Sequence, residues 1–172
     1  MKRALLIIIY SILSCQFSII NCQLTFSKGE EVFSTWEGFE VDKLASIWLI
    51  KRFVAPDASI IVYPKGEIIT RGVQFDTPHS KISRQFNIST FESLITHYKI
   101  DDKKLLNLGK LIHDIEINIW ERKVYQESRE IEESIIEILD RGEDNDEIIN
   151  TSNGYFDRLF TNISDELELV GQ

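Results

Sequence analysis

Helical spacing of apolar residues dominates the second half of this 172-residue chain and limits what it can fold into. One stripe follows Asp101 and another occupies residues 127–139, with Gly142 placed to end it. We expect a last helix from about Asp146 to Phe160, interrupted near Asn153-Gly154. Apolar residues three or four positions apart share one helix face, so these segments predict helices that pack together. The first stripe consists of Leu105, Leu108, Ile112, Ile115 and Ile119.

The region before these helices predicts one more helix and two strands. Apolar residues follow helical spacing from Asp42 to Val54, with Asp42 placed to cap the helix start and Pro56 beyond its end. Residues 58–63 form a β-branched apolar run that is typical of a buried strand, and residues 67–75 predict a second strand.

A polar, irregular stretch separates this sheet from the helices of the second half. We interpret residues 76–89 as a loop, followed by a short helix through Tyr98 that Ser89 or Thr90 can cap. The sequence therefore predicts a predominantly helical α+β fold, in which a small N-terminal sheet of two or three strands packs with a helical bundle.

The first 22 residues have the features of a signal peptide. Two basic residues precede an uncharged run over residues 4–20, which is too short and too often interrupted for a permanent membrane span. Cleavage between Cys22 and Gln23 would release residues 23–172 as a single domain. A lipoprotein-like box ending at Cys15 would instead leave a lipid-anchored protein. In both cases we expect an exported protein without a transmembrane span in its mature part. Within the domain we expect a core at about 34–161 and a frayed acidic tail at 162–172.

Charge and cysteine content exclude several functions. The chain has 28 acidic and 19 basic residues, and loss of Lys2 and Arg3 with the leader would lower the formal net charge from −9 to −11. Such an acidic surface repels phosphates, so nucleic acid is not an expected partner. After cleavage at Gln23 no cysteine remains, which excludes disulfides, thiolate nucleophiles and cysteine-bound zinc.

Six blocks of the sequence together carry a family resemblance. They are WEGFEVDKLASIWLIKRF at 36–53, PDA at 56–58, FD at 75–76, TFE at 90–92, LIHDIE at 111–116 and GYFDRLF at 154–160. In this order they resemble the C-terminal domain of the ChrB chromate-resistance proteins. The match runs from about Ser34 to Thr161 and is most specific in its first block and in the block around His113. The resemblance implies a role in chromate resistance and metal binding, in the exported, stand-alone form of the domain.

Two positions depart from the family pattern. The family usually has a histidine about eight residues before its Phe-Glu pair, which is Phe91-Glu92 here. Arg84 stands near that position, and His79 lies five residues further upstream. The family's usual cysteine just before the same pair is missing.

A candidate metal site can be assembled from the remaining histidines and carboxylates. His113 and Glu116 lie three residues apart on one helix face. Glu92 begins another helix, and Asp76 and His79 lie on the loop before it. Nitrogen and oxygen ligands of this kind favour iron or manganese, with zinc or nickel as alternatives.

Two functions follow from these features. The first is an exported metal-binding protein of chromate resistance, whose ion could support redox chemistry resembling superoxide dismutation, which would make it a metal-dependent oxidoreductase. The alternative is a non-enzymatic sensor or binding module with a structural metal or none. Lys43 and Arg52 could bind a small oxyanion such as chromate, although Arg52 could equally pair with a carboxylate. No nucleophile motif or phosphate-binding glycine loop supports a hydrolase.

Overall fold

The structure, a computed structural model, describes residues 31–118, 122–164, 166–167 and 169. The predicted signal peptide and Cys15 lie outside these residues. Within the described residues, five α-helices and three short strands confirm the predicted α+β class and its helical majority. The elements are β1 (Val32–Trp36), α2 (Val41–Leu49), the π-helical turn η1 (Ile50–Val54), β2 (Ser59–Tyr63), β3 (Val73–Gln74), α3 (Thr90–Tyr98), α4 (Lys103–Glu116), α5 (Gln126–Arg141) and α6 (Asn145–Asn162).

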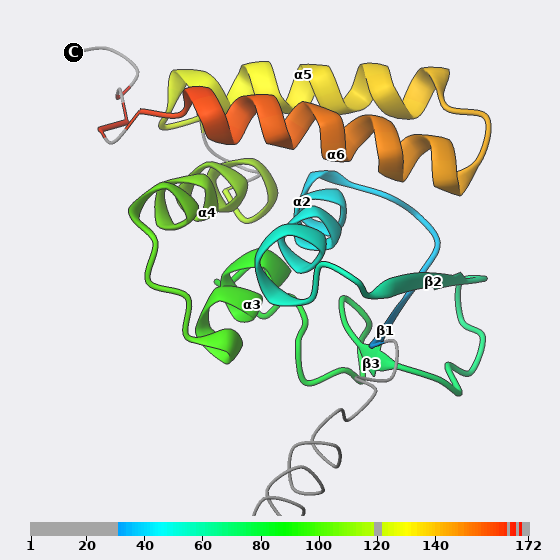
Figure 1. The fold of residues 1–172 in the computed structure, drawn as a ribbon. Helices are drawn as coiled ribbons and strands as arrows, with labels where there is room; N and C mark the ends of the chain where they lie inside the picture. Colours follow the sequence, from blue (N-terminus) through cyan, green and yellow to red (C-terminus); the bar gives the residue numbers. More distant parts are fainter. Residues whose placement is uncertain (1–30, 119–121, 165, 168, 170–172) are drawn as a thin grey trace, which may run out of the picture.

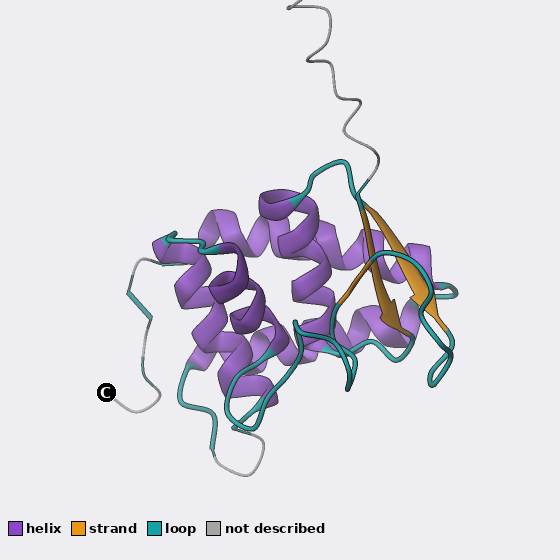
Figure 2. Cartoon of the chain, turned by 90° about the horizontal axis from the view of Figure 1, so that it is seen from below, coloured by secondary structure: helices purple, strands orange, loops and turns teal. Residues whose placement is uncertain are grey.

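The three strands form a parallel sheet at one side of the helices, in the order β2-β1-β3 (Figure 2). The central strand β1 was not predicted individually, and its Trp36 pairs with Tyr63 of β2. The predicted strand at 67–75 is wrong except at Val73–Gln74. Gly72 has a φ of 88°, and a Cβ there would lie 2.7 Å from the carbonyl oxygen of Val32. The chain therefore turns tightly against β1 before it can pair with it.

Helix α2 lies at the centre of the molecule, where it contacts α3, α4, α5 and α6 (Figure 1). All nine of its residues are buried, including Asp42 and Lys43. Charged groups in such a position require partners, because an unpaired charge is costly to remove from water. The prediction that Asp42 caps its own helix is wrong: Glu40 occupies the N-cap position of α2, and no side chain accepts a cap hydrogen bond there.

The boundaries of the other helices agree with the sequence patterns except in two places. Ser89 caps α3, as one of the two expected alternatives, and forms a capping box with Glu92. Asp102 rather than Asp101 caps α4. Helix α6 continues through Gly154 without the expected interruption. A glycine inside a helix lowers its stability by only about 1 kcal/mol relative to alanine, and burial of the nearby Phe156 stabilises the helix.

Helices α5 and α6 form a hairpin that packs over α2 and α4 (Figure 1). Asp157 of α6 accepts a hydrogen bond of 2.8 Å from the indole nitrogen of Trp48. Its two carboxylate oxygens also accept bonds of 2.9 Å from Arg52. Arg52 is thus paired with a carboxylate, in a fork geometry that suits a guanidinium group. The first and last blocks of the family resemblance therefore meet at this contact.

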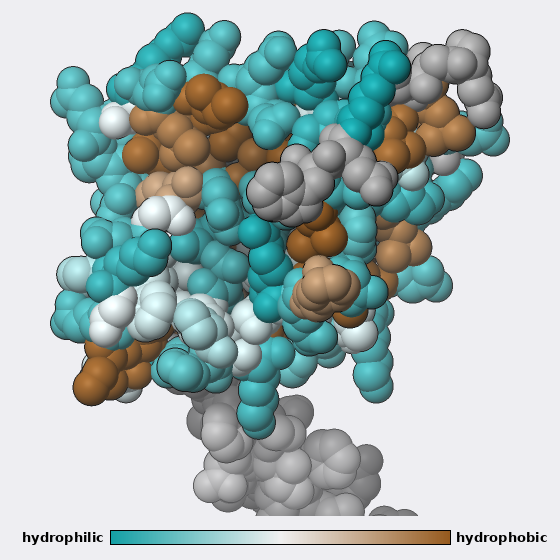
Figure 3. Space-filling view, turned by 180° about the vertical axis from the view of Figure 1, so that it is seen from behind, coloured by the Kyte–Doolittle hydropathy of each residue, from teal (hydrophilic) through white to brown (hydrophobic). Residues whose placement is uncertain are grey.

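The surface carries no single dominant apolar face in the view of Figure 3, where hydrophobic side chains form separate patches between hydrophilic ones. Phe86 and Ile68 are the most exposed large hydrophobic residues, at 99% and 82%. Within the described part of the chain, no helix is both long and apolar enough to cross a membrane.

Asp114 fixes the beginning of α5 from the neighbouring helix α4. The carboxylate is buried and accepts hydrogen bonds from the backbone nitrogens of Val124, at 2.9 Å and 3.0 Å, and of Tyr125, at 3.2 Å. Burial acts to raise the pKa of Asp114, but these hydrogen bonds outweigh it and hold the pKa below its usual value. The residue therefore stabilises the fold in its ionised form.

We predict that Asp114→Ala lowers the free energy of unfolding by about 1–3 kcal/mol, because buried backbone donors at the start of α5 lose their acceptor. The loss should shrink as the pH falls below about 4, where the wild-type carboxylate also becomes protonated. Urea unfolding at several pH values measures both effects. Asp140→Ala on the exposed face of α5 is the matched control, and an equal effect of the two substitutions would refute the role of Asp114.

Candidate functional site

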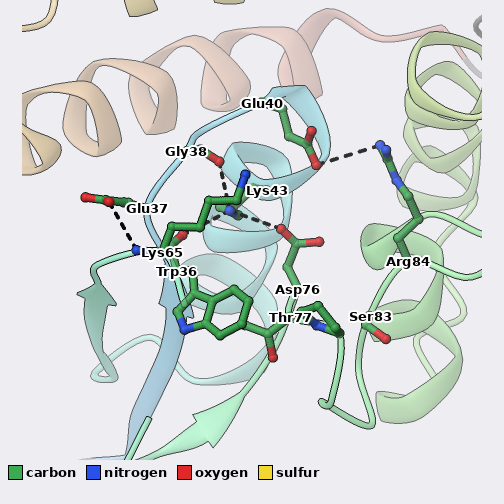
Figure 4. Close-up of a pocket in the computed structure, with 11 residues that line it drawn as sticks. Trp36, Glu37, Gly38, Glu40, Lys43, Lys65, Asp76, Thr77, Ser83 and Arg84 are labelled. Carbon is green, nitrogen blue, oxygen red and sulfur yellow. Dashed lines mark hydrogen bonds and ion pairs between the residues drawn. The ribbon is translucent and has the colours of Figure 1, made fainter. Parts of the chain in front are cut away.

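The candidate site is a cleft of about 360 Å³ where the three parallel strands end (Figure 4). Trp36 is the last residue of β1, Lys65 follows β2, and Asp76 follows β3. The start of α2 and the loop before α3 complete the walls. The lining residues are Trp36, Glu37, Gly38, Glu40, Lys43, Lys65, Asp76, Thr77, Pro78, Ser83 and Arg84.

Lys43 ties the sheet edge to α2. Its ammonium group donates hydrogen bonds to the carbonyl oxygens of Trp36, at 2.9 Å, and Gly38, at 2.8 Å. It also lies 3.4 Å from a carboxylate oxygen of Asp76. The other oxygen of Asp76 accepts a bond of 2.6 Å from the hydroxyl group of Thr90. An ammonium group has three donors, so Lys43 is fully occupied within the protein.

Asp42 binds the N-terminus of α3. Its two carboxylate oxygens accept the backbone N–H groups of Thr90, at 2.7 Å, and Phe91, at 2.8 Å. The capping box between Ser89 and Glu92 satisfies the N–H groups of those two residues. A negative charge at a helix N-terminus interacts favourably with the unpaired N–H groups and the helix dipole. Asp42 thus joins the central helix to α3.

The guanidinium group of Arg84 lies among three carboxylates. It is 2.5 Å from an oxygen of Glu116 at the end of α4, and 3.8 Å from an oxygen of Glu40. Its Nε atom is 3.8 Å from an oxygen of Asp42. The other oxygen of Glu116 accepts the backbone N–H of Asp42 at 3.4 Å. Arg84 therefore connects the loop before α3 with the beginning of α2 and the end of α4.

Acidic groups outnumber cations in this network, and their pKa values reflect it. Burial raises the pKa of Asp42 to about 7, against the opposing effect of the hydrogen bonds from Phe91 and Thr90. Burial also raises the pKa of Glu40, and the nearby charge of Glu116 adds to the increase. Burial acts to lower the pKa of Arg84, but its pairing with Glu116 and Glu40 raises it overall. The network is thus short of positive charge.

The five residues expected to bind a metal do not converge on one point. Asp76 is paired with Lys43, and Glu116 is paired with Arg84. His79 is exposed and is not among the residues that line the cleft. Within residues 31–118 and 122–164 and the described positions beyond them, no group of three or more histidine, cysteine or acidic side chains is arranged to hold a metal ion. These five residues therefore do not fit a shared ligand set in this arrangement.

Two of the five candidates do meet, on the other side of the α3 N-terminus. The Nδ1 atom of His113 lies 3.0 Å from an oxygen of Glu92, and both side chains are about one-third exposed, at 35% and 30%. The same oxygen of Glu92 accepts the N–H of Ser89. Glu92 therefore takes part in the capping box as well as in the contact with His113. Glu92 and His113 by themselves could offer a metal ion only two ligands.

Glu40, Asp42 and Arg84 were not predicted from the sequence as residues of this network. Arg84 was noted only as a departure from the family pattern, and Asp42 was expected to cap α2 rather than α3. The available indication was the charged cluster Glu40-Val41-Asp42-Lys43 at the start of an otherwise apolar helix. Three charges so close to a buried segment imply specific partners elsewhere in the chain. Of the two anion-binding candidates, Lys43 and Arg52, both are paired with carboxylates.

The raised pKa of Asp42 predicts a pH-dependent stability. The folded protein keeps a proton on Asp42 up to about pH 7, whereas an unfolded chain releases it near pH 4. The contribution of Asp42 to the free energy of unfolding should therefore fall as the pH rises from about 4 to about 7. Asp42→Asn should remove this contribution, and urea unfolding across the range measures it. The exposed Asp57→Asn is the control, and identical pH profiles for wild type and Asp42→Asn would disprove the assignment.

Comparison with known proteins identifies the family. The model of a family described as ChrB, C-terminal domain, matches residues 33–163. Neither the curated proteins nor the solved structures that were compared gave a significant match. The family match spans both ends of the charged network, from β1 through α6, and covers most of the chain. This chain therefore belongs to the family of the ChrB C-terminal domain.

Proposed function

We propose that this member of the ChrB family is a non-enzymatic binding module in chromate resistance, and that its cleft accepts a positively charged group of a ligand. The observation that supports the proposal is the state of Glu40. Its side chain is 42% exposed beside the cleft, and its pKa is raised by burial and by Glu116. The cations around it already have partners, so an incoming cation would relieve the excess of acidic charge.

The position of the cleft supports a role in binding. Parallel strands bring their carboxyl ends to one edge, and ligands of open parallel sheets bind beyond that edge. Here the residues at or just after the ends of β1, β2 and β3 all line the cleft. Its volume of about 360 Å³ suits a side chain or a small molecule. The indole ring of Trp36 adds an aromatic surface, which attracts cations.

The charges of the cleft favour a cation over chromate itself. Lys43 uses its donors on two carbonyl oxygens and Asp76. Arg84 is engaged by Glu116, Glu40 and Asp42. Lys65 is the remaining cation of the lining, and it is exposed at the rim. An oxyanion would therefore have to compete with carboxylates for Lys43 and Arg84, and we expect the module to act in chromate resistance without binding chromate in this cleft.

The same geometry gives less support to a metal-dependent oxidoreductase. The pair of Glu92 and His113 provides an imidazole and a carboxylate, whereas a redox-active iron or manganese ion usually has a larger set of protein ligands. The remaining acidic candidates, Asp76 and Glu116, are bound to cations of the chain. A binding module needs neither an ion nor a nucleophile, and this is why we favour it.

Export of the module is a further part of the proposal and rests on the N-terminal sequence. Mass spectrometry of the protein recovered from its host should find a mature chain that begins at Gln23. A lipidated N-terminus at Cys15 would support the alternative form, and a full-length chain in the cytoplasm would contradict export.

The proposed ligand preference can be tested by NMR titration with the blocked amino acid N-acetyl-lysine methylamide. We expect the probe to shift the indole N–H signal of Trp36, because its ammonium group would lie between that ring and Glu40. Glu40→Gln removes the charge with little change of shape and should weaken binding by about tenfold, which corresponds to ~1.4 kcal/mol. Glu137→Gln on the exposed face of α5 is the matched control and should have no effect.

Chromate and sulfate serve as the opposing probes in the same titration. Neither should shift the signals of the cleft residues. Saturable binding of either oxyanion at the cleft, or binding of the lysine probe that is unchanged in Glu40→Gln, would disprove the proposed charge preference.

A further inference from the structure

We infer that the guanidinium group of Arg84 takes the place of a metal ion among the carboxylates of Glu40, Asp42 and Glu116, so that this chain stabilises its acidic cluster without a metal. The inference goes beyond the proposed ligand of the cleft. It concerns which cation stabilises the cluster itself. The family resemblance implies a metal ion, whereas the structure places Arg84 among these carboxylates.

The three carboxylates come from segments far apart in the chain. Glu40 and Asp42 lie at the beginning of α2, and Glu116 is the last residue of α4. Folding brings these like charges together around Arg84, which lies 2.5 Å from an oxygen of Glu116 and 3.8 Å from oxygens of Glu40 and Asp42. Without a cation between them, the cluster would repel itself in a partly buried setting. The structure therefore requires a cation at this position.

Arg84 meets this requirement from the side of the cleft. Its side chain is about one-third exposed, at 34%, while those of Glu116 and Asp42 are 12% and 0% exposed. The guanidinium group has five donors in a planar fork, which can serve several carboxylates at once. One cation therefore contacts all three acids, as a bridging metal ion would.

Three oxygen atoms of the cluster also accept hydrogen bonds from backbone N–H groups. Both oxygens of Asp42 accept N–H groups of α3, and one oxygen of Glu116 accepts the backbone N–H of Asp42. A divalent ion would need oxygens at about 2.0–2.6 Å, in a geometry that it largely dictates. It would have to displace these hydrogen bonds and repel the charge of Arg84. The charge and the geometry both disfavour a metal while Arg84 is present.

The other titratable groups near the cluster do not change this balance. Lys43 and Asp76 pair with each other on the cleft side. Glu92 and His113 pair with each other at the first turn of α3. Above about pH 7, where Asp42 is ionised, removal of Arg84 therefore leaves three carboxylates without their main counter-charge, and this creates the conditions for a divalent cation to bind.

The test compares metal binding by wild type, Arg84→His, Arg84→Gln and Arg84→Lys. Isothermal titration calorimetry with manganese chloride and with zinc chloride measures the binding. Thermal unfolding with and without EDTA measures its effect on stability. Wild type should show no stoichiometric binding, and EDTA should leave its unfolding temperature unchanged. Arg84→His and Arg84→Gln should bind at least one of the ions about tenfold more tightly than wild type and gain stability from it.

Two controls separate charge from general damage. Arg84→Lys keeps a positive charge near the cluster and should remain metal-free. Arg52→Gln removes another arginine from a carboxylate, Asp157, at a distant position and should not gain metal binding. If an Arg84 variant is unfolded alone, recovery of its fold on addition of manganese or zinc counts as binding.

Two results would overturn the inference. The first is a stoichiometric metal ion in wild-type protein that binds as tightly as in Arg84→Gln. The second is a failure of both neutral variants, folded or not, to respond to either metal. The lysine titration of the cleft is a separate measurement, so the proposed ligand preference stands or falls independently.

Discussion

The carboxylate of Asp42 at the first turn of α3 is the interaction on which the other contacts of the site depend. The group is fully buried and accepts two backbone N–H groups at 2.7 Å and 2.8 Å. A buried acid in the central helix would be very unfavourable without such partners. With them, α2 and α3 are held at a fixed separation, and the backbone N–H of Asp42 is presented to Glu116 of α4. One residue, through its side chain and its backbone N–H, thus connects three helices.

This constraint gives the family blocks a physical meaning. The first block contains Asp42 and Lys43, whose side chains contact different parts of the molecule. Asp42 binds the N-terminus of α3, and Lys43 binds the sheet edge and Asp76. The end of that block and the last block meet where Arg52 contacts Asp157. In the block around His113, the neighbour Asp114 anchors the start of α5. Many of the charged residues in these blocks, which could be taken for catalytic or metal-binding residues, therefore form contacts that hold the fold together.

The sequence predicts those features of the fold that depend on local spacing. The apolar periodicity locates the helices, and Ser89, one of the two expected alternatives, caps α3. The missed features depend on contacts between distant segments. Strand β1 has no alternating pattern because both of its faces are buried in part, and its residues Phe33, Ser34 and Thr35 are all inaccessible. The prediction of a strand over residues 67–75 is mostly wrong because the chain turns at Gly72, close to the backbone of β1.

The candidate site was less predictable, for the same reason. His113 and Glu116 were expected to share an ion because they lie three residues apart on one helix. In the structure, His113 faces Glu92 and Glu116 faces Arg84, so the two side chains serve different partners. Helical spacing places two residues on one face but does not indicate which cation reaches each of them. Only the position of the loop that carries Arg84 decides this, and that loop has no periodic pattern.

The central claim is that a guanidinium group, and not a metal ion, stabilises the acidic cluster of the wild-type protein. A crystal structure of protein purified without chelators, with anomalous diffraction data collected above the manganese, iron and zinc absorption edges, tests it most directly. We predict density for Arg84 between Glu40, Asp42 and Glu116, with no anomalous peak among them. A strong anomalous peak among these carboxylates, with Arg84 turned away into solvent, would contradict the claim.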